Sequence, residues 1–391
     1  MTPSRPVRRI RDRVVSAGLS LVNACMPKRA STIALHSFPD FSDEVISLLE
    51  ETTKRGYEPV VLLEDATGTG GLPASAAVPG PYRAVAKNSL RGWFHYLTAS
   101  VVITSHGLYR PHRPARGQVV VNIWHGELGK PVARFLGERP PVQATHATAL
   151  SAVGRAFVCG EFGLEPRRVL VVGAPRNDRM ITTDRDSVRR ALLGDTPARR
   201  LLVWLPTYRD HGPDRRGGRV DGVRFTGAVP LSPDEQVRLD DWLSANDTVL
   251  VVKPHPSALA PQHGQYRRIV VVDQADVTAR SITTGELLGA ADCLITDASS
   301  VWVDFLLQDE PVMFFFPDIA EYEASRGLYL QPYDAWVPGP LLRDGDELLV
   351  ALDRWVRGDD DYADARRTSR ARLHRFTDEF STARLLDELG L

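Results

Sequence analysis

The chain has few cysteines and no long apolar run, and each lack excludes a class of protein. Only three cysteines occur among its 391 residues, namely Cys25, Cys159 and Cys293. They are far apart and odd in number, so they form neither a disulfide framework nor a paired metal-ligand pattern, which favours a reducing compartment. No apolar stretch approaches the roughly 18–20 residues needed to span a bilayer. The sequence therefore predicts neither a disulfide-stabilised secreted domain nor a membrane-spanning protein.

An excess of charge of one sign is also missing. The formal net charge is −1, from 48 basic and 49 acidic residues. A nucleic-acid-binding protein usually carries a strong basic field, so we expect no nucleic-acid partner. Lysine is scarce beside arginine, which draws attention to Lys253 in "VVKPHP", where a compact ammonium group follows an apolar run.

Several motifs of nucleotide and hydrolase chemistry do not occur. The sequence has no GxGxxG after its first apolar run, no Walker loop, no HExxH and no GxSxG with partners. No Asp-x-Asp stands at a predicted strand end, and the acidic run "DDDYAD" (359–364) reads as a solvated face. We therefore predict no metal ligands and no cofactor, and we expect any phosphate chemistry to use histidine and helix dipoles.

What the sequence does contain is a regular alternation of apolar runs and amphipathic segments after residue 30. Near-continuous Val/Ile/Leu runs that alternate with helical patterns predict parallel sheets covered on both faces. Two series of such runs predict an α/β fold with two Rossmann-like, doubly wound domains, joined near 185–200. The predicted segments are an N-terminal segment (1–30), a first Rossmann-like domain (31–190), a second one (191–342) and C-terminal helices (343–391).

The N-terminal segment, "RPVRRIRDRVVSAGLSLVNACMPKR", allows three interpretations. As a helix it places Val7, Ile10, Val14, Ala17, Leu21 and Cys25 on one face, with arginines off that face. This pattern favours an amphipathic helix on an anionic membrane surface. A helix packed on the protein body and a cleaved signal peptide are the alternatives.

Polar clusters follow six of the apolar runs, where the carboxyl ends of parallel strands bind ligands. The candidate binding residues in these clusters are His125, Gly126, Arg176, Asn177, Asp178, Thr207, Arg209, Lys253, Pro254, His255, Thr296, Asp297, Ser299, Ser300 and Asp318. Six clusters from both halves of the chain predict a cleft between two domains.

Each cluster also has an ordinary structural interpretation. Ser299 and Ser300 could only cap a helix, although free N–H groups at a helix start also bind anions. The lysine and histidine of "KPHP" could form a surface turn, and Arg176 to Asp178 an Asx turn. His125 could be a structural histidine, although an imidazole at a strand end suits a general base.

The motifs occur in an order that resembles one known family. "IWHGELGKP", "VVGAPRNDRM", "VWLPTYRD", "VVKPHP", "LLGAADCLITDASSVWVDFLL" and "PVMFFFPDIAEYEASRGLY" resemble the CDP-glycerol glycerophosphotransferases of teichoic-acid synthesis, from about Ser100 to Pro340. The resemblance implies a GT-B architecture in which the first Rossmann-like domain takes the acceptor and the second binds the CDP-polyol. It also implies that the C-terminal helices return to the first domain.

The resemblance further implies a reaction and roles for residues. Glycerol phosphate would pass from CDP-glycerol to a hydroxyl of a membrane-bound, lipid-linked acceptor, with release of CMP. His125 would deprotonate that hydroxyl, while His255, with Lys253, would bind the diphosphate. Thr296, Ser299 and Ser300 would hold phosphate oxygens, Arg176, Asn177 and Asp178 would line the cleft, and Asp318 and Arg326 would contact donor or acceptor.

Alternatives to this function remain at the level of the sequence. We consider three: a CDP-ribitol-using transferase, a GT-B glycosyltransferase using a sugar nucleotide, and a non-catalytic binder of nucleotide or anionic polymer. The product could be wall polymer or capsule. The lack of a large extra module favours a primase or single-step transferase at least as much as a long-chain polymerase. The expected location is the cytoplasmic face of the membrane, as a peripheral protein, and a homo-oligomer is left open.

Overall fold

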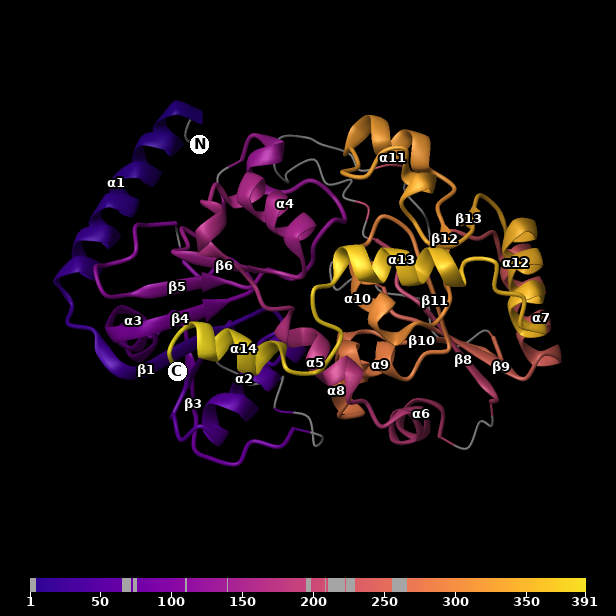
Figure 1. Cartoon of the computed structure of the whole chain (residues 1–391), viewed down its shortest axis with the longest axis horizontal. Helices are drawn as coiled ribbons and strands as arrows, with labels where there is room; N and C mark the ends of the chain where they lie inside the picture. The colour runs from indigo at the N-terminus through magenta and orange to yellow at the C-terminus, as the bar shows by residue number, and fades with distance from the viewer. Residues whose placement is uncertain are drawn as a thin grey trace. The chain divides into compact units, whose positions relative to one another are not determined.

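The computed structural model describes residues 5–64, 72, 76–109, 111–138, 140–194, 198–207, 209, 222, 229–254 and 266–391, with side chains from residue 14 onward. The chain forms two compact units (Figure 1). The first unit comprises Met1–Glu127, Val132–Arg179 and His374–Leu391, and the second comprises Leu128–Pro131 and Met180–Leu373. The chain therefore passes between units at 179/180, before the expected junction. Residues 343–373 belong to the second unit, so only the last 18 residues return to the first.

The first unit is built on a parallel sheet whose described strands follow the order β3-β2-β1-β4-β5-β6-β7. The strands are β1 (Arg29–His36), β2 (Val60–Leu63), β3 (Arg83–Ala86), β4 (Ala99–Thr104), β5 (Val119–Asn122), β6 (His146–Ala149) and β7 (Val169–Val171). The chain winds outward from β1 in one direction and from β4 in the other. The switch point of the sheet therefore lies between the carboxyl ends of these two strands.

Both faces of this sheet are buried because successive side chains point to opposite faces. Ile33 and Leu35 of β1 join the cluster on one face, and Ala34 joins the cluster on the other. This explains why the strands read as continuous apolar runs rather than alternating ones.

Helices cover both faces of the first sheet. They are α2 (Asp43–Lys54), α3 (Leu90–Thr98), α4 (Ala152–Phe162), α5 (Pro175–Ile181), which ends in the second unit, and α14 (Ser381–Glu388), with 3-10 turns η1 (Ala133–Leu136) and η2 (Pro166–Arg168). The C-terminal helix α14 lies beside α2 (Figure 1). Its Leu385 and Leu386 are fully buried, and each contributes roughly 1.5–3 kcal/mol of hydrophobic stabilisation. This burial fastens the end of the chain to the first unit.

The second unit repeats the same winding. Its described strands follow the order β10-β9-β8-β11-β12-β13, all in parallel pairs. They are β8 (Arg200–Trp204), β9 (Thr248–Val252), β10 (Ile269–Val271), β11 (Cys293–Thr296), β12 (Val312–Phe315) and β13 (Leu341–Leu342). The switch point of this sheet lies between β8 and β11. The predicted α/β class with two parallel sheets is confirmed.

The helices of the second unit complete its layers. They are α6 (Arg185–Leu193), α7 (Pro233–Ala245), α8 (Gln274–Ala279), α9 (Thr284–Gly289), α10 (Val301–Phe305), α11 (Ile319–Ser325), α12 (Gly345–Arg357) and α13 (Ala363–Leu373), with η3 (Leu306–Gln308) and η4 (Tyr333–Ala335). One face of the sheet packs Trp204 edge-on against Phe315, with ring centroids 5.2 Å apart, and Leu239 and Leu243 of α7 join the same core.

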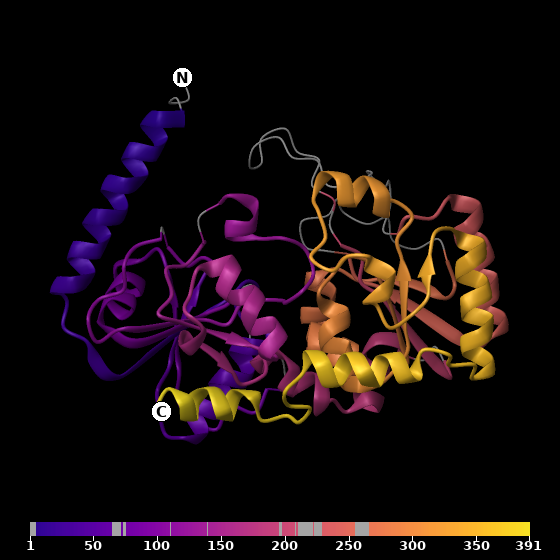
Figure 2. The same ribbon diagram turned by 45° about the horizontal axis from the view of Figure 1, so that its top comes forward.

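The N-terminal segment forms one helix, α1 (Arg5–Cys25), which projects beyond the first sheet (Figure 2). Its polar side chains face the protein. Asn23 donates to Gln118 Oε1 at 2.8 Å, and Ser20 Oγ accepts from the N–H of Arg113 at 3.0 Å. On the other side, Val14 and Leu21 are 66% and 68% exposed. The helix is thus attached by its polar side, and its apolar stripe is open to solvent. No described helix is long and apolar enough to cross a membrane.

Candidate active site

The loop after β5 carries the predicted catalytic histidine, His125, on an unusual backbone. Trp124 has φ = +32° and Leu128 has φ = +61°, left-handed values that bulky residues rarely adopt. Such conformations cost about 1–3 kcal/mol each and persist where neighbouring contacts hold them. Here the Trp124 N–H donates to Asn122 Oδ1 at 3.1 Å, and its ring packs edge-on against Phe162. These contacts present His125 at the surface.

A backbone contact sets the tautomer of His125. Its Nδ1 lies 3.3 Å from the carbonyl oxygen of Ser105. A carbonyl oxygen can only accept, so Nδ1 carries the hydrogen and the neutral ring has its lone pair on Nε2. This orientation gives His125 the form of a general base.

A second histidine, His106, lies directly against His125. The two rings are stacked, with centroids 4.3 Å apart and an interplanar angle of 9°. Burial lowers the pKa of His106, against the opposing charges of Glu44 and Glu64, so its ring is neutral at pH 7 and can stack on its neighbour without charge repulsion. Sequence reasoning missed this residue, although "VVITSHG" repeats the run-then-His-Gly pattern of "VVVNIWHG".

Glu127 fixes the other end of the histidine loop. Its buried carboxylate accepts the N–H of Leu150 through Oε1 at 2.9 Å. A Cβ atom on Gly154 would lie 1.9 Å from Oε2, so a side chain at that position of α4 would displace the end of the Glu127 carboxylate. Glu127 was not predicted as a site residue, and Gly126 lies between it and His125, partly buried. The loop is therefore held at both ends by side chains that pair with distant backbone.

Arg176, Asn177 and Asp178 lie in the first turn of α5, not in a turn closed by an Asx hydrogen bond. Arg176 donates to the carbonyl of Trp124 at 3.2 Å, which places its guanidinium at the base of the histidine loop. The carboxylate of Asp178 accepts the N–H groups of Ser381 and Thr382 at 3.0 and 2.8 Å. Burial raises the pKa of Asp178 to about 6, and the hydrogen bonds from Thr382 and Ser381 oppose that rise.

Asp178 thus holds the start of α14, a structural role that sequence reasoning did not foresee. Asn177 is buried and its backbone N–H donates to Ala174. The assignment of these three residues to a substrate cleft stays a prediction, and the contact of Arg176 with the loop of His125 is the one that links them to the site.

In the second unit, Arg209 joins two predicted site carboxylates at the carboxyl ends of β11 and β12. Its Nε and Nη2 donate to both oxygens of Asp318, at 2.9 and 2.8 Å, and its Nη1 lies 2.9 Å from Asp297 Oδ2. The guanidinium also lies over the rings of Tyr322 and Phe316. These two carboxylates keep the pKa of Arg209 above its usual range against the cost of burial. We call Arg209, Asp297 and Asp318 the arginine cluster.

Threonines complete the switch point between β8 and β11. The N–H and hydroxyl of Thr207 both donate to Asp297 Oδ1. Thr296 is fully buried and its hydroxyl donates to the carbonyl of Leu205 at 2.8 Å. Thr296 therefore has a structural contact, and the role toward phosphate that the resemblance implied stays a prediction. The arginine cluster and Thr207 shape the loops at this end of the sheet.

Ser299 and Ser300 precede α10, as predicted, and Ser300 is its N-cap residue. The hydroxyl of Ser299 accepts the N–H of Val301 at 3.4 Å, whereas Ser300 makes no side-chain cap bond. A Cβ atom on Gly129 would lie 2.8 Å from the N–H nitrogen of Ser300. The glycine of "HGELG" thus allows the backbone of that motif to lie against the start of α10.

The remaining predicted residues lie at the ends of β9 and α11. Lys253 and Pro254 are buried directly after β9, while His255 falls outside the described residues. Arg326 ends α11 and donates to the carbonyl of Pro131 at 3.3 Å. Among the described residues, no group of three His, Cys, Asp or Glu side chains is placed to hold a metal ion.

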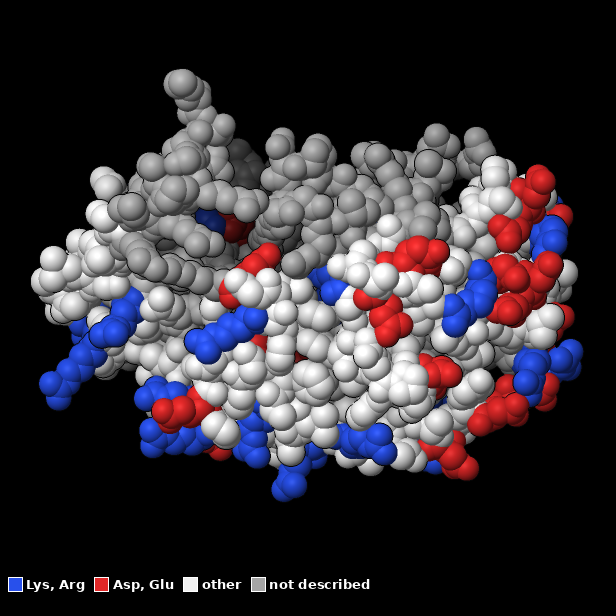
Figure 3. All heavy atoms as spheres, turned by 90° about the horizontal axis from the view of Figure 1, so that it is seen from above, with Lys and Arg blue, Asp and Glu red and all other residues white. Residues whose placement is uncertain are grey.

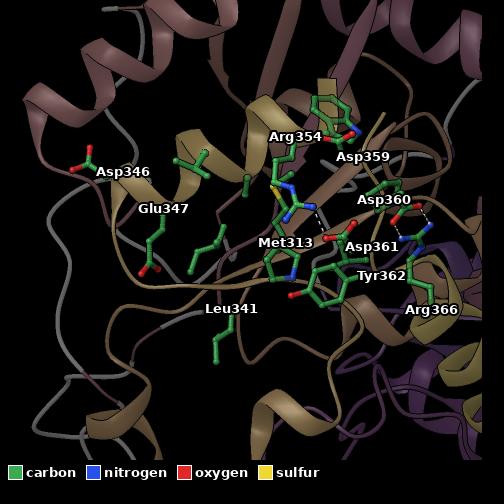
Figure 4. A pocket seen from close by; sticks show the side chains of 17 residues that line it. Met313, Leu341, Asp346, Glu347, Arg354, Asp359, Asp360, Asp361, Tyr362 and Arg366 are labelled. Atoms are coloured by element: carbon green, nitrogen blue, oxygen red, sulfur yellow. Dashed lines mark hydrogen bonds and ion pairs between the residues drawn. The ribbon is translucent and has the colours of Figure 1, made fainter. Parts of the chain in front are cut away.

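The charged side chains in the described part of one face are mixed in sign (Figure 3). A hollow of about 450 Å³ lies elsewhere in the second unit, beside Pro311 and Pro340 at the amino ends of β12 and β13. Ion pairs of Arg354 with Asp361 and of Arg366 with Asp360 are among the side chains that line it (Figure 4). Because ligands of such sheets bind at the carboxyl ends, this hollow is not part of the candidate site.

Two Rossmann-like units with polar switch points define an architecture that solved structures share. The chain aligns with the wall teichoic acid polymerase TagF at a TM-score of 0.71 and 20% identity, covering 98% of this chain and 96% of that chain. A putative UDP-N-acetylglucosamine 2-epimerase from Listeria monocytogenes aligns at a TM-score of 0.55 and 12% identity, covering 92% and 95%. The likeness to TagF and to this epimerase bears out the predicted GT-B-like fold. Another TagF structure comes from a crystal soaked with CDPG.

The family follows from the sequence itself. The family model for CDP-glycerol:poly(glycerophosphate) glycerophosphotransferase matches residues 19–390, and the chain belongs to this family. Relatives include the teichoic acid ribitol-phosphate polymerase TarL of Staphylococcus aureus, 25% identical over 63% of this chain and 44% of that protein. The teichoic acid glycerol-phosphate primase of Bacillus subtilis is 24% identical over 51% and 50%. The chain spans about half the length of these relatives.

Proposed function

We propose that the protein transfers a polyol phosphate from a CDP-polyol, with CDP-glycerol as the leading donor, to a hydroxyl of a lipid-linked acceptor. The observation that carries this proposal is His125, whose Nδ1–H is held on Ser105 so that Nε2 has the lone pair. In a chain of this family, that is the group needed to activate an acceptor hydroxyl.

The proposed reaction is an in-line phosphoryl transfer. The acceptor oxygen attacks the phosphorus that carries the polyol, and its proton passes to His125 Nε2. The bond from this phosphorus to the bridging oxygen breaks, and CMP leaves with that oxygen. Positioning and stabilisation of negative charge carry most of such a transfer.

The second unit would hold the donor at the carboxyl ends of its strands. Lys253 and His255 are assigned to the diphosphate by the resemblance, and Ser299 and Ser300 offer hydroxyl and N–H groups before α10. The arginine cluster would act by positioning. The donors of Arg209 already reach Asp297, Asp318 and Thr207, so it shapes the loop that carries Thr207 rather than binding phosphate itself.

A CDP-ribitol donor is the second candidate, because the relatives include both ribitol-phosphate and glycerol-phosphate enzymes. CMP release by the purified protein should be compared with CDP-glycerol and CDP-ribitol, using a detergent-solubilised prenyl-diphosphate disaccharide as acceptor. We expect release with one donor, and a loss of at least about 100-fold in His125→Ala, as for removal of a general base.

The matched control is His146→Ala, because His146 begins β6 at the opposite, amino end of the sheet. Full activity in His125→Ala would refute the assignment of the base. Release of a nucleoside diphosphate from a sugar nucleotide would instead support the glycosyltransferase alternative.

We also propose that α1 attaches the protein to an anionic membrane surface. The helix is bound to the first unit through Ser20 and Asn23. This leaves Val14 and Leu21 exposed, and the sequence before Val14 supplies arginines. An apolar stripe flanked by basic residues is the pattern of an interfacial helix.

The test is co-sedimentation with vesicles that contain phosphatidylglycerol. Val14→Glu with Leu21→Glu should release the protein, because both side chains are exposed and their replacement leaves the contacts of the polar side intact. Val350→Glu is the matched control, since Val350 is 63% exposed on α12 of the second unit. Unchanged binding of the double variant would contradict the proposal.

A further inference from the structure

The carboxyl edge of the first sheet holds a group of side chains that the proposed chemistry does not use. β1 ends at His36, β2 is followed by Glu64, β3 by Lys87 and β4 by His106. These strands are neighbours in the sheet, and β1 and β4 flank its switch point, where ligands bind in this class of fold.

The polar members of the group contact one another in a chain. Lys87 Nζ pairs with Glu64 Oε1. His36 Nδ1 lies 2.8 Å from the carbonyl of Leu62 and therefore donates to it. Its Nε2 then carries the lone pair, lies 3.5 Å from Glu64 Oε1 and is fully buried without a hydrogen-bond partner. Two acceptors face each other here, so the neutral His36 does not hold the carboxylate, and the ammonium group of Lys87 is the group that orients Glu64.

Among these contacting side chains, solvent reaches the carboxylate of Glu64, whose side chain is 36% exposed. Its backbone N–H donates to Asp40 Oδ1 at 2.7 Å, which ties it to the loop after β1. Lys87 neutralises one negative charge, while Glu44 adds another near His106. The site is thus rich in acceptors and has no surplus of positive charge, which disfavours a phosphate and favours a neutral ligand with hydroxyl donors.

An aromatic ring stands beside these acceptors. Phe38 is 53% exposed, and its ring meets that of His106 edge-on at 6.1 Å, while His106 stacks on His125. The loop that carries Phe38 is closed by its own hydrogen bonds, from Ser37 to the carbonyl of Pro39 and from Ser42 to Ser37. A preformed loop that exposes an apolar ring next to hydroxyl acceptors fits the apolar face of a sugar or polyol.

We propose that Phe38, Glu64 and His106 form the subsite that binds the neutral, polyhydroxylated unit of the acceptor. Glu64 accepts its hydroxyl groups, Phe38 covers its C–H face, and His106 joins the subsite to the ring of His125. Lys87 is the positioning residue that holds Glu64. The inference rests on the proposed transfer and adds the chemical class of the group that meets the base.

The experiment measures KM for acceptor and donor separately in Phe38→Ala and Glu64→Gln. We expect each variant to raise the acceptor KM about tenfold, the size of a lost aromatic or hydrogen-bond contact, with donor KM within about twofold. Phe380→Ala is the matched control, because Phe380 is 55% exposed in the same unit and lies at the start of α14. An unchanged acceptor KM in both variants, or an equal rise of both KM values, would overturn the subsite.

A binding measurement separates failure of the subsite from failure of the proposed transfer. Saturation-transfer NMR with the methyl glycoside of an N-acetylhexosamine disaccharide needs no donor and no turnover. If the wild type releases no CMP from any donor but transfers saturation to the disaccharide, and Phe38→Ala does not, the subsite stands and the transfer fails. If the wild type transfers no saturation to the disaccharide, the subsite is overturned.

Discussion

Replacement of His36 should change how the stability of the first unit depends on pH. The ring is fully buried, and this desolvation lowers its pKa from about 6.5 to about 4, although the hydrogen bond to Leu62 and the charge of Glu64 act in the opposite direction. Lys87 and His106 add to the lowering. Between these two pH values the unfolded chain binds more protons at His36 than the folded chain does. Acidification through this window therefore destabilises the native state.

The size of this effect follows from the two pKa values. A pKa difference of this size corresponds to about 3 kcal/mol when both states are fully titrated. Between pH 7.5 and 4.5, His36 should therefore cost the native state about 2.5 kcal/mol. In His36→Asn the side-chain amide can still donate to the carbonyl of Leu62 but does not titrate. The variant should lose about 2.5 kcal/mol less than the wild type over this pH range.

The assay is urea unfolding at each pH, followed by hydrogen exchange of peptides from β1 and β4. These peptides report on the first unit alone, which is necessary because two units need not unfold together. Asp178, whose pKa is raised to about 6, contributes with the opposite sign: its stabilisation is present at low pH and is lost as the pH rises through 6. It is common to both proteins and cancels in the difference. Parallel pH curves would refute the assignment of a neutral, desolvated His36.

Two further predictions concern positioning residues. Arg209→Lys keeps the charge but loses the two-pronged contact with Asp318. We expect the second unit to lose roughly 1.5–3 kcal/mol, the size of a lost hydrogen bond to a charged group. Thermal unfolding followed on peptides of β11 and β12 measures this, and unchanged unfolding would contradict it. Gly154→Ala would place Cβ against Glu127, so CMP release should fall while stability drops by roughly 1–3 kcal/mol. Gly18→Ala is the control, since no atom lies within 4 Å of a Cβ there. Helix propensity alone predicts that this control gains up to about 1 kcal/mol of stability. Similar effects of the two variants would refute the role of Glu127.

The architecture of each sheet could be predicted from the sequence because its signal is local. Apolar runs of strand length alternate with helical periods, and both faces of a parallel sheet are buried, so the runs are continuous. The motif order was enough to identify the family, which the family model bears out. The stripe through Val14 and Leu21 likewise predicted an amphipathic helix, and α1 has these residues on its exposed side.

The unit boundary and the partners of the site residues depended on contacts between distant positions. Helices α12 and α13 were expected to return with the C-terminus, but they pack within the second unit, and of the three C-terminal helices α14 is the one whose leucines join the core of the first sheet. Polarity alone does not show which unit a mostly polar helix will cover.

The candidate active site divides in the same way between what the sequence shows and what only the fold shows. That His125 follows a strand and precedes a glycine was readable from the sequence, and so was its suitability as a base. Only the fold reveals the partners of His125, because each lies on a different strand or loop. Ser105 orients the ring, His106 stacks on it, and Glu127 anchors its loop to Leu150. Asp178 and Thr296, which were predicted as ligand residues, make hydrogen bonds to the start of α14 and to Leu205 that only the fold reveals, and their roles toward a ligand stay predictions. The sequence by itself determined which chemical groups this protein carries and in what order. The tertiary structure alone decided which of them meet, because hydrogen-bond partners are set by distance in space and not by separation along the chain.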